Sequence, residues 1–391
     1  MNQADDVVIV AAKRTPMGSF LGELAPLSAV ELGAMALQAL AVPKQMVIDE
    51  VIMGCVLGAA LGQAPARQVA LAAGLGHSVG ATTVNKVCGS GIKAMMMAAD
   101  SITAGQMDSV IAGGMESMSN TPYMLEKARS GYRMGHQQVC DHMMLDGLED
   151  AYQQQSMGLL AQATADKYQL TRQQMDAYAA QSIERAQDAA TQGRFAAEIT
   201  EITIAKRKQV TRINSDEGLK RSQMDKLPQL RPAFSQRGTI TAGNASSIAD
   251  GAAAVLMTRA SLATAMDVTP LGKVVAYASH AQAPEEFTLA PIGAINKLLH
   301  RCGWQADEVD LWEINEAFAM VAILAIEQLG LDSSKVNVNG GACVLGHPLG
   351  ASGTRIVVSL IHGLRQRGLS KGVASLCIGG GEAVAIAIEI V

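Results

Sequence analysis

The sequence predicts a layered α/β protein in which two similar halves flank an inserted loop region. Apolar, β-branched runs of strand length alternate with amphipathic helical segments near both ends of the chain, a pattern typical of α/β folds. In each half a glycine turn opens a helix and a second glycine turn follows about 25 residues later, so that Gly89 precedes Gly113 and Gly353 precedes Gly379. We therefore expect a duplicated α/β unit with mainly parallel strands, whose turns meet at one shared cleft.

The expected elements follow the hydrophobic pattern from one end of the chain to the other. In the first half we expect strands at 7–10, 47–54 and 109–116, and helices at 27–41, 63–73 and 92–104. In the second half we expect strands at 272–278, 309–314, 336–338 and, as the closing strand, 373–378, with helices at 291–302, 317–329 and 351–366.

The middle of the chain does not show the alternation of strands and helices that is expected in the two halves. Residues 119–150 are irregular and rich in Met, His and Gly, whereas 157–192 are strongly helical, with Thr171 as an N-cap. Basic residues then crowd a polar segment at 206–221, which indicates either a solvated face or contact with a phosphorylated ligand. We expect the first half at 1–119, the insert at 120–242, a return to the first core at 243–267 and the second half at 268–391.

Composition narrows the function classes. The 391 residues carry a net charge of −5 with a sequence pI near 5.8, which argues against a nucleic-acid or anionic-membrane partner. The most apolar windows are interrupted by glycines and acids, and the segment 1–6 lacks a signal-peptide pattern. The six cysteines form no C-x-x-C pair, so we expect no zinc site and a reduced, cytoplasmic enzyme.

Cys88 is the first candidate for chemistry. It lies at a turn between a short extended segment and a helix that runs to Gly105. The helix dipole favours a thiolate at this position, although it does not ionise the thiol fully, so a base partner is expected elsewhere. The alternative is that Cys88 is a small, buried apolar residue at a crowded turn.

Three further motifs resemble the signatures of the thiolase family. They are Asn-Gly-Gly-Ala-Cys-Val-Leu-Gly-His-Pro-Leu-Gly-Ala-Ser-Gly-Thr-Arg at 339–355, Ser-Leu-Cys-Ile-Gly-Gly-Gly-Glu-Ala at 375–383 and Asn-Glu-Ala-Phe at 315–318. The resemblance runs the whole length of the chain, from the segment 8–16 to the last strand. It implies the thiolase fold, a duplicated α-β-α-β-α core whose inserted loop domain covers the active site and binds coenzyme A (CoA).

The resemblance assigns a role to each reactive residue. Cys88 is the implied nucleophile, and His347, which alone would read as a surface loop histidine, takes its proton. Cys377, otherwise a buried strand cysteine, is the implied acid/base at the α-carbon of a thioester. Asn315 holds a water that forms one oxyanion hole with His347, and the backbone N–H groups of Cys88 and Gly379 form the other.

The implied reaction is the reversible condensation of two acetyl-CoA molecules to acetoacetyl-CoA and CoA through an acetyl-Cys88 intermediate. CoA is then a substrate or product, and no cofactor is expected. The alternative within the family is a broader 3-oxoacyl-CoA thiolase of fatty-acid β-oxidation. A second alternative is a condensing enzyme with a Cys-His-His or Cys-His-Asn set, but the second thiol at Cys377 argues against it. A third is a non-catalytic CoA-binding module, and the presence of the complete reactive set argues against that. Family members are usually homodimers or homotetramers.

Candidate ligand contacts lie outside the reactive set. We expect Lys220 and Arg221 at the CoA phosphates, Ser247 at the pantetheine, and Met157, Phe287 and Phe318 at the acyl end. Three stretches depart from the acetyl-specific pattern: Ser156-Met157-Gly158, Phe287-Thr288-Leu289-Ala290-Pro291 and Glu382-Ala383. The first two bear on the preferred acyl length. A bulky Phe287 would disfavour long chains, whereas Ser156, smaller than the usual His, could open a second route.

Overall fold

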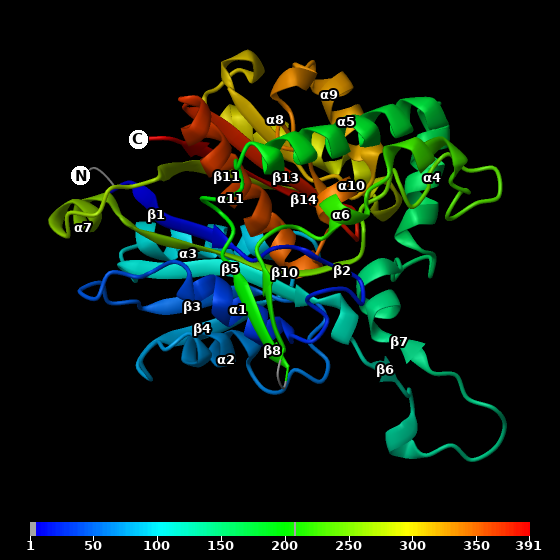
Figure 1. The fold of residues 1–391 in the computed structure, drawn as a ribbon, viewed down its shortest axis with the longest axis horizontal. Coiled ribbons are helices and arrows are strands. Elements are labelled where there is room, and N and C mark those ends of the chain that lie inside the picture. The colour runs from blue at the N-terminus through cyan, green and yellow to red at the C-terminus, as the bar shows by residue number, and fades with distance from the viewer. Residues whose placement is uncertain (1–4, 207–208) are drawn as a thin grey trace.

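The computed structural model describes residues 5–206 and 209–391 (Figure 1). Residues 207 and 208 of the expected basic segment lie outside the described residues. The chain is organised around a ten-stranded sheet in the order β4-β3-β5-β10-β1-β11-β14-β13-β12, with β2 paired to β10 at its side. The two halves join where Val8 and Ile9 of β1 pair with Lys273 and Gly272 of β11.

The strands of this sheet come from both ends of the chain. The first half contributes β1 (Val7–Arg14), β2 (Gly18–Ser19), β3 (Glu50–Gly54), β4 (Gly80–Val84), β5 (Ser109–Ser117) and β10 (Ala249–Arg259). The second half contributes β11 (Gly272–Ala281), β12 (Leu311–Ile314), β13 (Lys371–Ile378) and β14 (Glu382–Glu389).

The expectation of mainly parallel strands was wrong. Only β3–β4, β3–β5 and β12–β13 are parallel among the named strand pairs of this sheet, and the others are antiparallel. The chain turns tightly at 379–381 and returns as β14, a strand that the sequence analysis did not predict, since it took 373–378 as the closing strand. A tight turn can join only antiparallel neighbours. The expected strand at 336–338 is also wrong, because Val336 makes only an isolated bridge to Trp312.

Helices cover both halves of the sheet and fill the space between them. The outer helices are α1 (Ala29–Gln38) and α2 (Pro65–Ala72) on one side, and α8 (Ala290–Cys302) and α9 (Ala319–Leu329) on the other. The central helices α3 (Ser90–Thr103) and α11 (Leu349–Arg367) share one apolar core with strands of both halves. Figure 1 shows α11 between the outer helices α8 and α2. The layered α-β-α-β-α architecture is therefore confirmed.

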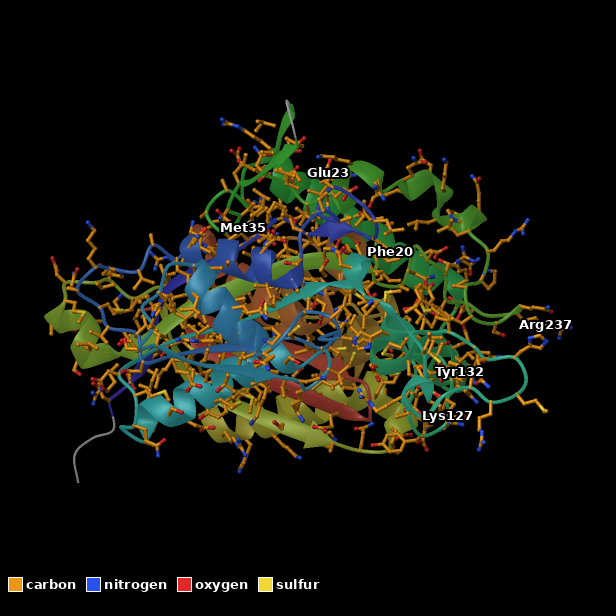
Figure 2. All side chains as sticks on the ribbon, turned by 90° about the horizontal axis from the view of Figure 1, so that it is seen from below. Phe20, Glu23, Met35, Lys127, Tyr132 and Arg237 are labelled. Atoms are coloured by element: carbon orange, nitrogen blue, oxygen red, sulfur yellow. The ribbon has the colours of Figure 1, made fainter. Side chains whose placement is uncertain are left out.

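The region 120–242, called the cover below, lies between β5 and β10 in the chain. Its main helices are α4 (Met157–Lys167) and α5 (Arg172–Thr191), and Thr171 caps α5 as expected, with its side chain accepting the N–H of Gln174. The short pair β6 (Tyr123–Met124) and β7 (Cys140–Asp141) carries a projecting loop (Figure 1). Figure 2 shows Lys127 and Tyr132 on this loop.

Shorter elements connect these helices and strands. They are β8 (Ile202–Lys206), β9 (Gln209–Ile213), α6 (Gly218–Arg221), α7 (Ala260–Ala265) and α10 (Ala342–Leu345), a π-helical turn at Met144–Leu148, and 3-10 turns at Met118–Asn120, Ala128–Ser130, Met224–Gln229, Pro284–Leu289, Ala306–Glu308 and Ser333–Lys335. Within the described ranges, none of the helices has the length and apolar character that crossing a bilayer requires.

Candidate active site

Cys88 lies in a sharp turn between β4 and α3. The preceding residue, Val87, has a φ of 46°, a left-handed conformation that a β-branched side chain rarely adopts. Ser90 braces the turn, because its hydroxyl accepts the N–H of Lys86 at 2.8 Å and donates to the Val87 carbonyl at 2.7 Å. The sequence therefore builds a strained and internally bonded loop that ends at the thiol.

A close contact between α3 and α11 brings the Cys88 turn to the His347 loop. A Cβ atom added to Gly91 or to Gly353 would lie 2.6 Å from a backbone nitrogen of the opposite helix. Only glycine fits at such a distance. Because Cys88 and His347 each lie just before the start of one of these helices, the glycine contact places both residues in the same region.

His347 is buried and held at two points. Its backbone N–H donates to the Ser247 carbonyl at 2.9 Å, and its Nδ1 lies 2.5 Å from the Ser352 hydroxyl. Its Nε2 atom is buried and makes no hydrogen bond to any residue that the structure describes. Burial, followed by the charge of Arg355, lowers the pKa of His347 to about 3. The imidazole is therefore neutral at ordinary pH, with one free nitrogen.

The surroundings of Cys88 favour the thiol over the thiolate. Burial raises the pKa of Cys88 to about 11, although the backbone N–H groups of Gly379 and of Cys88 itself donate to the sulfur and lower it. The charge of Glu116 raises it further. The backbone N–H groups lower the pKa of this half-buried thiol in the expected direction, but desolvation raises it by more, so that the thiol form needs a base partner.

Cys377 and Asn315 end two adjacent parallel strands. Cys377 lies near the end of β13, and burial followed by the charge of Cys88 raises its pKa far above the ordinary range. The two thiols are thus close enough for one charge to act on the other. Asn315 follows β12, and its backbone N–H donates to the Ser375 carbonyl at 3.0 Å.

The amide of Asn315 has a defined orientation. Its Oδ1 accepts from Nη2 of the buried Arg355 at 3.4 Å, whereas its Nδ2 is buried and has no hydrogen-bond partner among the described residues. Buried amide nitrogens are normally paired with protein or water. The unpaired Nδ2 is therefore suited to donate to a water or to a substrate oxygen.

Two buried carboxylates organise the loops around these residues. Glu116 accepts the backbone N–H groups of Val56, Leu57 and Gly350 at 2.8–3.0 Å, which ties a loop of the first half to the start of α11. Burial raises the pKa of Glu116 to about 7. The sequence analysis did not identify this residue, because its partners are backbone groups that are far away in sequence.

Glu316 is the second buried carboxylate. It accepts from the Tyr178 hydroxyl at 3.1 Å and from the Ser182 hydroxyl at 2.8 Å, both on α5, and from the Asn337 amide and the Cys343 N–H at 2.9 and 3.0 Å. It therefore ties the cover to the second half directly beside Asn315. The Asn-Glu-Ala-Phe motif contains this residue, but no signal in the sequence indicates its four partners.

A cavity of about 720 Å³ lies between the cover and the core. Of the ligand contacts expected from the sequence, Met157, Arg221, Ser247 and Phe318 line it. None of the five reactive residues expected from the sequence lines the cavity, but three of them, Cys88, His347 and Gly379, contact residues of its wall. The Met157 side chain lies beside Gly379, the Ser247 carbonyl binds His347, and the lining residues Leu148 and Ile248 pack in one apolar cluster with Cys88.

Aromatic rings form the apolar end of the cavity. Phe287 does not line it, because this buried ring packs edge-to-face behind Phe318, with centroids 6.4 Å apart. Phe234 lies on the cavity wall instead, 6.1 Å from Phe318. A Cβ atom on Gly158 would lie 2.3 Å from the Phe234 ring. The ring can therefore occupy this position only because residue 158 has no side chain. Phe234 belongs to no recognisable motif, and the sequence analysis missed it.

Basic residues lie at the rim formed by α6 and the following turn. Arg221 lines the cavity and pairs with Glu217 at 2.5 Å, whereas Lys220 pairs with Glu23 at 3.0 Å and does not line it. Figure 2 places Glu23 on the loop that follows β2. Lys226 also lines the cavity, although the sequence analysis did not name it. Among the described residues, no three His, Cys, Asp or Glu side chains are arranged to hold a metal ion.

The five-layered fold and a site with two thiols, a neutral imidazole and two N–H groups at one sulfur define a thiol-dependent acyltransferase. Two family models cover nearly the whole chain: the thiolase N-terminal domain matches residues 7–261 and the thiolase C-terminal domain matches residues 268–390. The chain belongs to the thiolase family.

Individual relatives are similar to this chain over nearly their full length. The chain is 49% identical to acetyl-CoA acetyltransferase 2 of Arabidopsis thaliana over 98% of this chain and 97% of that protein. It is 48% identical to acetyl-CoA acetyltransferase of Escherichia coli over 98% of each chain. A crystal structure of Acat5 thiolase from Ascaris suum in complex with CoA superimposes with a TM-score of 0.93 at 42% identity, over 99% of this chain and 100% of that chain. The Bacillus anthracis acetyl-CoA acetyltransferase does so with a TM-score of 0.97 at 39% identity, over 100% of both.

Proposed function

We propose that the chain is an acetyl-CoA C-acetyltransferase, which condenses two acetyl-CoA molecules to acetoacetyl-CoA and CoA and also catalyses the reverse thiolysis. The observation that carries the proposal is the pair of interacting thiols, Cys88 and Cys377, one of which receives two backbone N–H groups. The names of the relatives at 48–49% identity support acetyl-CoA as the substrate. CoA acts as substrate and product, and the proposed chemistry uses no other bound group.

The first half-reaction transfers acetyl to the enzyme. The Cys88 sulfur attacks the thioester carbonyl while the free Nε2 of His347 takes the thiol proton. The N–H groups of Cys88 and Gly379 stabilise the oxyanion, an effect worth about 10²- to 10³-fold in rate for each donor. The carbon–sulfur bond to CoA then breaks, and Cys377 gives its proton to the departing CoA thiolate.

The second half-reaction forms the carbon–carbon bond. The Cys377 thiolate removes a proton from the methyl group of a second acetyl-CoA, whose enolate oxygen is stabilised by His347 and by a water on Asn315. The carbanion attacks acetyl-Cys88, Cys88 departs, and His347 returns its proton.

The test is thiolysis of acetoacetyl-CoA by CoA, measured as kcat/KM against 3-oxohexanoyl-CoA and 3-oxooctanoyl-CoA. The Phe234 and Phe318 rings restrict the apolar end, so acetoacetyl-CoA should be cleaved best. Each added methylene should reduce kcat/KM, by about 10-fold or more in a tight pocket. Equal activity on 3-oxooctanoyl-CoA would favour the broader β-oxidation thiolase, and CoA binding without turnover would identify a binding module.

We also propose that the chain is a homodimer or homotetramer that acts on the acetyl-CoA of fatty-acid metabolism in the cytoplasm. The projecting loop between β6 and β7 supports self-association, because it exposes several large apolar side chains, of which Met134 is 93% exposed. The six free cysteines suit a reducing compartment. Light scattering of the full chain, compared with a variant shortened within 125–138, tests the assembly.

A further inference from the structure

A single buried hydroxyl contacts the ring of His347 from the side opposite its free nitrogen. Ser352 lies in the first turn of α11, and its side chain is fully buried. Its Oγ is 2.5 Å from His347 Nδ1 and 2.8 Å from the Pro348 carbonyl oxygen. The hydroxyl therefore stands between an imidazole nitrogen and a carbonyl that can only accept.

The hydroxyl has one proton to donate, and the two contacts decide where it goes. If Ser352 donates to the Pro348 carbonyl, its oxygen offers lone pairs to Nδ1, and Nδ1 must carry the ring hydrogen. Both contacts are then hydrogen bonds. If Ser352 donates to Nδ1 instead, two oxygens face each other at 2.8 Å without a hydrogen between them. The ring hydrogen would then sit on Nε2, which is buried and without a described partner.

This choice matters because the imidazole does not titrate near neutral pH. The pKa of His347 is lowered to about 3, first by burial and then by the charge of Arg355. The ring is therefore neutral in both arrangements, and only the position of its hydrogen decides whether Nε2 can accept a proton from a thiol.

We propose that Ser352 is a positioning residue that holds His347 as the Nδ1–H tautomer and so leaves Nε2 bare to act as the base for Cys88. This inference rests on the proposed function, in which His347 takes the Cys88 proton. Ser352 itself does not touch the substrate in this account. It acts through the ring, by a hydrogen bond that requires the chain to turn into α11 directly after the Gly-His-Pro loop.

The direct measurement is the ¹⁵N spectrum of the full-length protein labelled at histidine. His347 is one of seven histidines, and its signals are assigned by comparison with His347→Asn. In the wild type, Nδ1 should show the shift of a protonated ring nitrogen and Nε2 that of an unprotonated one. Ser352→Ala should move both shifts toward each other, whereas Ser352→Thr, which keeps a hydroxyl, should restore them.

The kinetic measurement is the single-turnover release of CoA from acetyl-CoA. A general base contributes about 10²- to 10⁴-fold, and Ser352→Ala still populates the active tautomer in part. We therefore expect acetylation of Cys88 to fall by about 10- to 100-fold, with KM for CoA nearly unchanged. Ser359→Ala is the matched control, because it removes another buried hydroxyl of α11, one that lies 3.3 Å from Glu198. It should change neither the ring shifts nor acetylation.

Two results would overturn the inference: a wild-type spectrum with the hydrogen on Nε2, or wild-type ring shifts and acetylation in Ser352→Ala. If Ser352→Ala does not fold, the wild-type spectrum and Ser352→Thr still decide the question. Failure of the proposed function looks different. A wild-type protein without thiolase activity, but with the hydrogen on Nδ1, would refute the function and leave the tautomer assignment standing.

Discussion

Alkylation of Cys88 should accelerate tenfold with each pH unit and show no plateau below pH 10. The reason is that burial raises the pKa of this thiol to about 11, despite the N–H groups of Cys88 and Gly379 that donate to the sulfur. Only the thiolate reacts with iodoacetamide. The rate therefore follows the ionised fraction, which keeps rising until the pH passes the pKa.

The size of the effect follows from the pKa. At pH 7.5 an unperturbed thiol with a pKa of roughly 8.5 is about 10% ionised, whereas a thiol with a pKa of about 11 is ionised to about 0.03%. Cys88 should thus react about 300-fold more slowly than a free thiol of equal nucleophilicity. Acetylation by acetyl-CoA should instead vary little between pH 6 and 9, because His347 accepts the proton during attack and stays neutral over this range.

The assay is the second-order rate of iodoacetamide labelling from pH 6.5 to 10, with peptide mapping to follow Cys88 separately from the other five cysteines. Acetyl-CoA should protect this residue. Up to pH 10 we expect Cys88 to react more slowly than a free thiol of equal nucleophilicity. A labelling rate that levels off below pH 8 would show a preformed thiolate, and the conclusion that desolvation outweighs the N–H dipoles would then be wrong.

Three further predictions test other parts of the site. Cys377→Ala should still form acetyl-Cys88 in a single turnover but should lose condensation and thiolysis; near-normal thiolysis would make Cys377 a structural residue. Arg221→Glu should raise KM for CoA by about fivefold, more so at low salt, with kcat little changed, whereas Lys220→Glu should do less because Lys220 does not line the cavity. Phe287→Ala should lower the free energy of unfolding by about 3 kcal/mol with only a small change in chain-length preference, because the buried ring lies behind the cavity wall; a flattened preference at wild-type stability would contradict this placement.

Much of the fold and the reactive set could be predicted from sequence because both depend on local patterns. Strand-length apolar runs and helical periodicity placed most elements, and Thr171 was identified as an N-cap because capping involves only neighbouring residues. The two thiols, the Gly-His-Pro loop and the Asn-Glu-Ala-Phe element carry the family resemblance as short motifs, and the family-model matches confirmed the family.

Other properties required the tertiary structure. The protonation of Cys88, the position of Phe287 behind Phe318 and the place of Phe234 on the cavity wall depend on neighbours that are distant in sequence. Desolvation is a sum over everything packed around a group, so no turn motif indicates its size. Pairing of β14 with both β11 and β13 likewise depends on which edges are free after folding. The sequence by itself therefore determined which residues could react, whereas packing decided their charge, their orientation and the shape of the cavity that they serve.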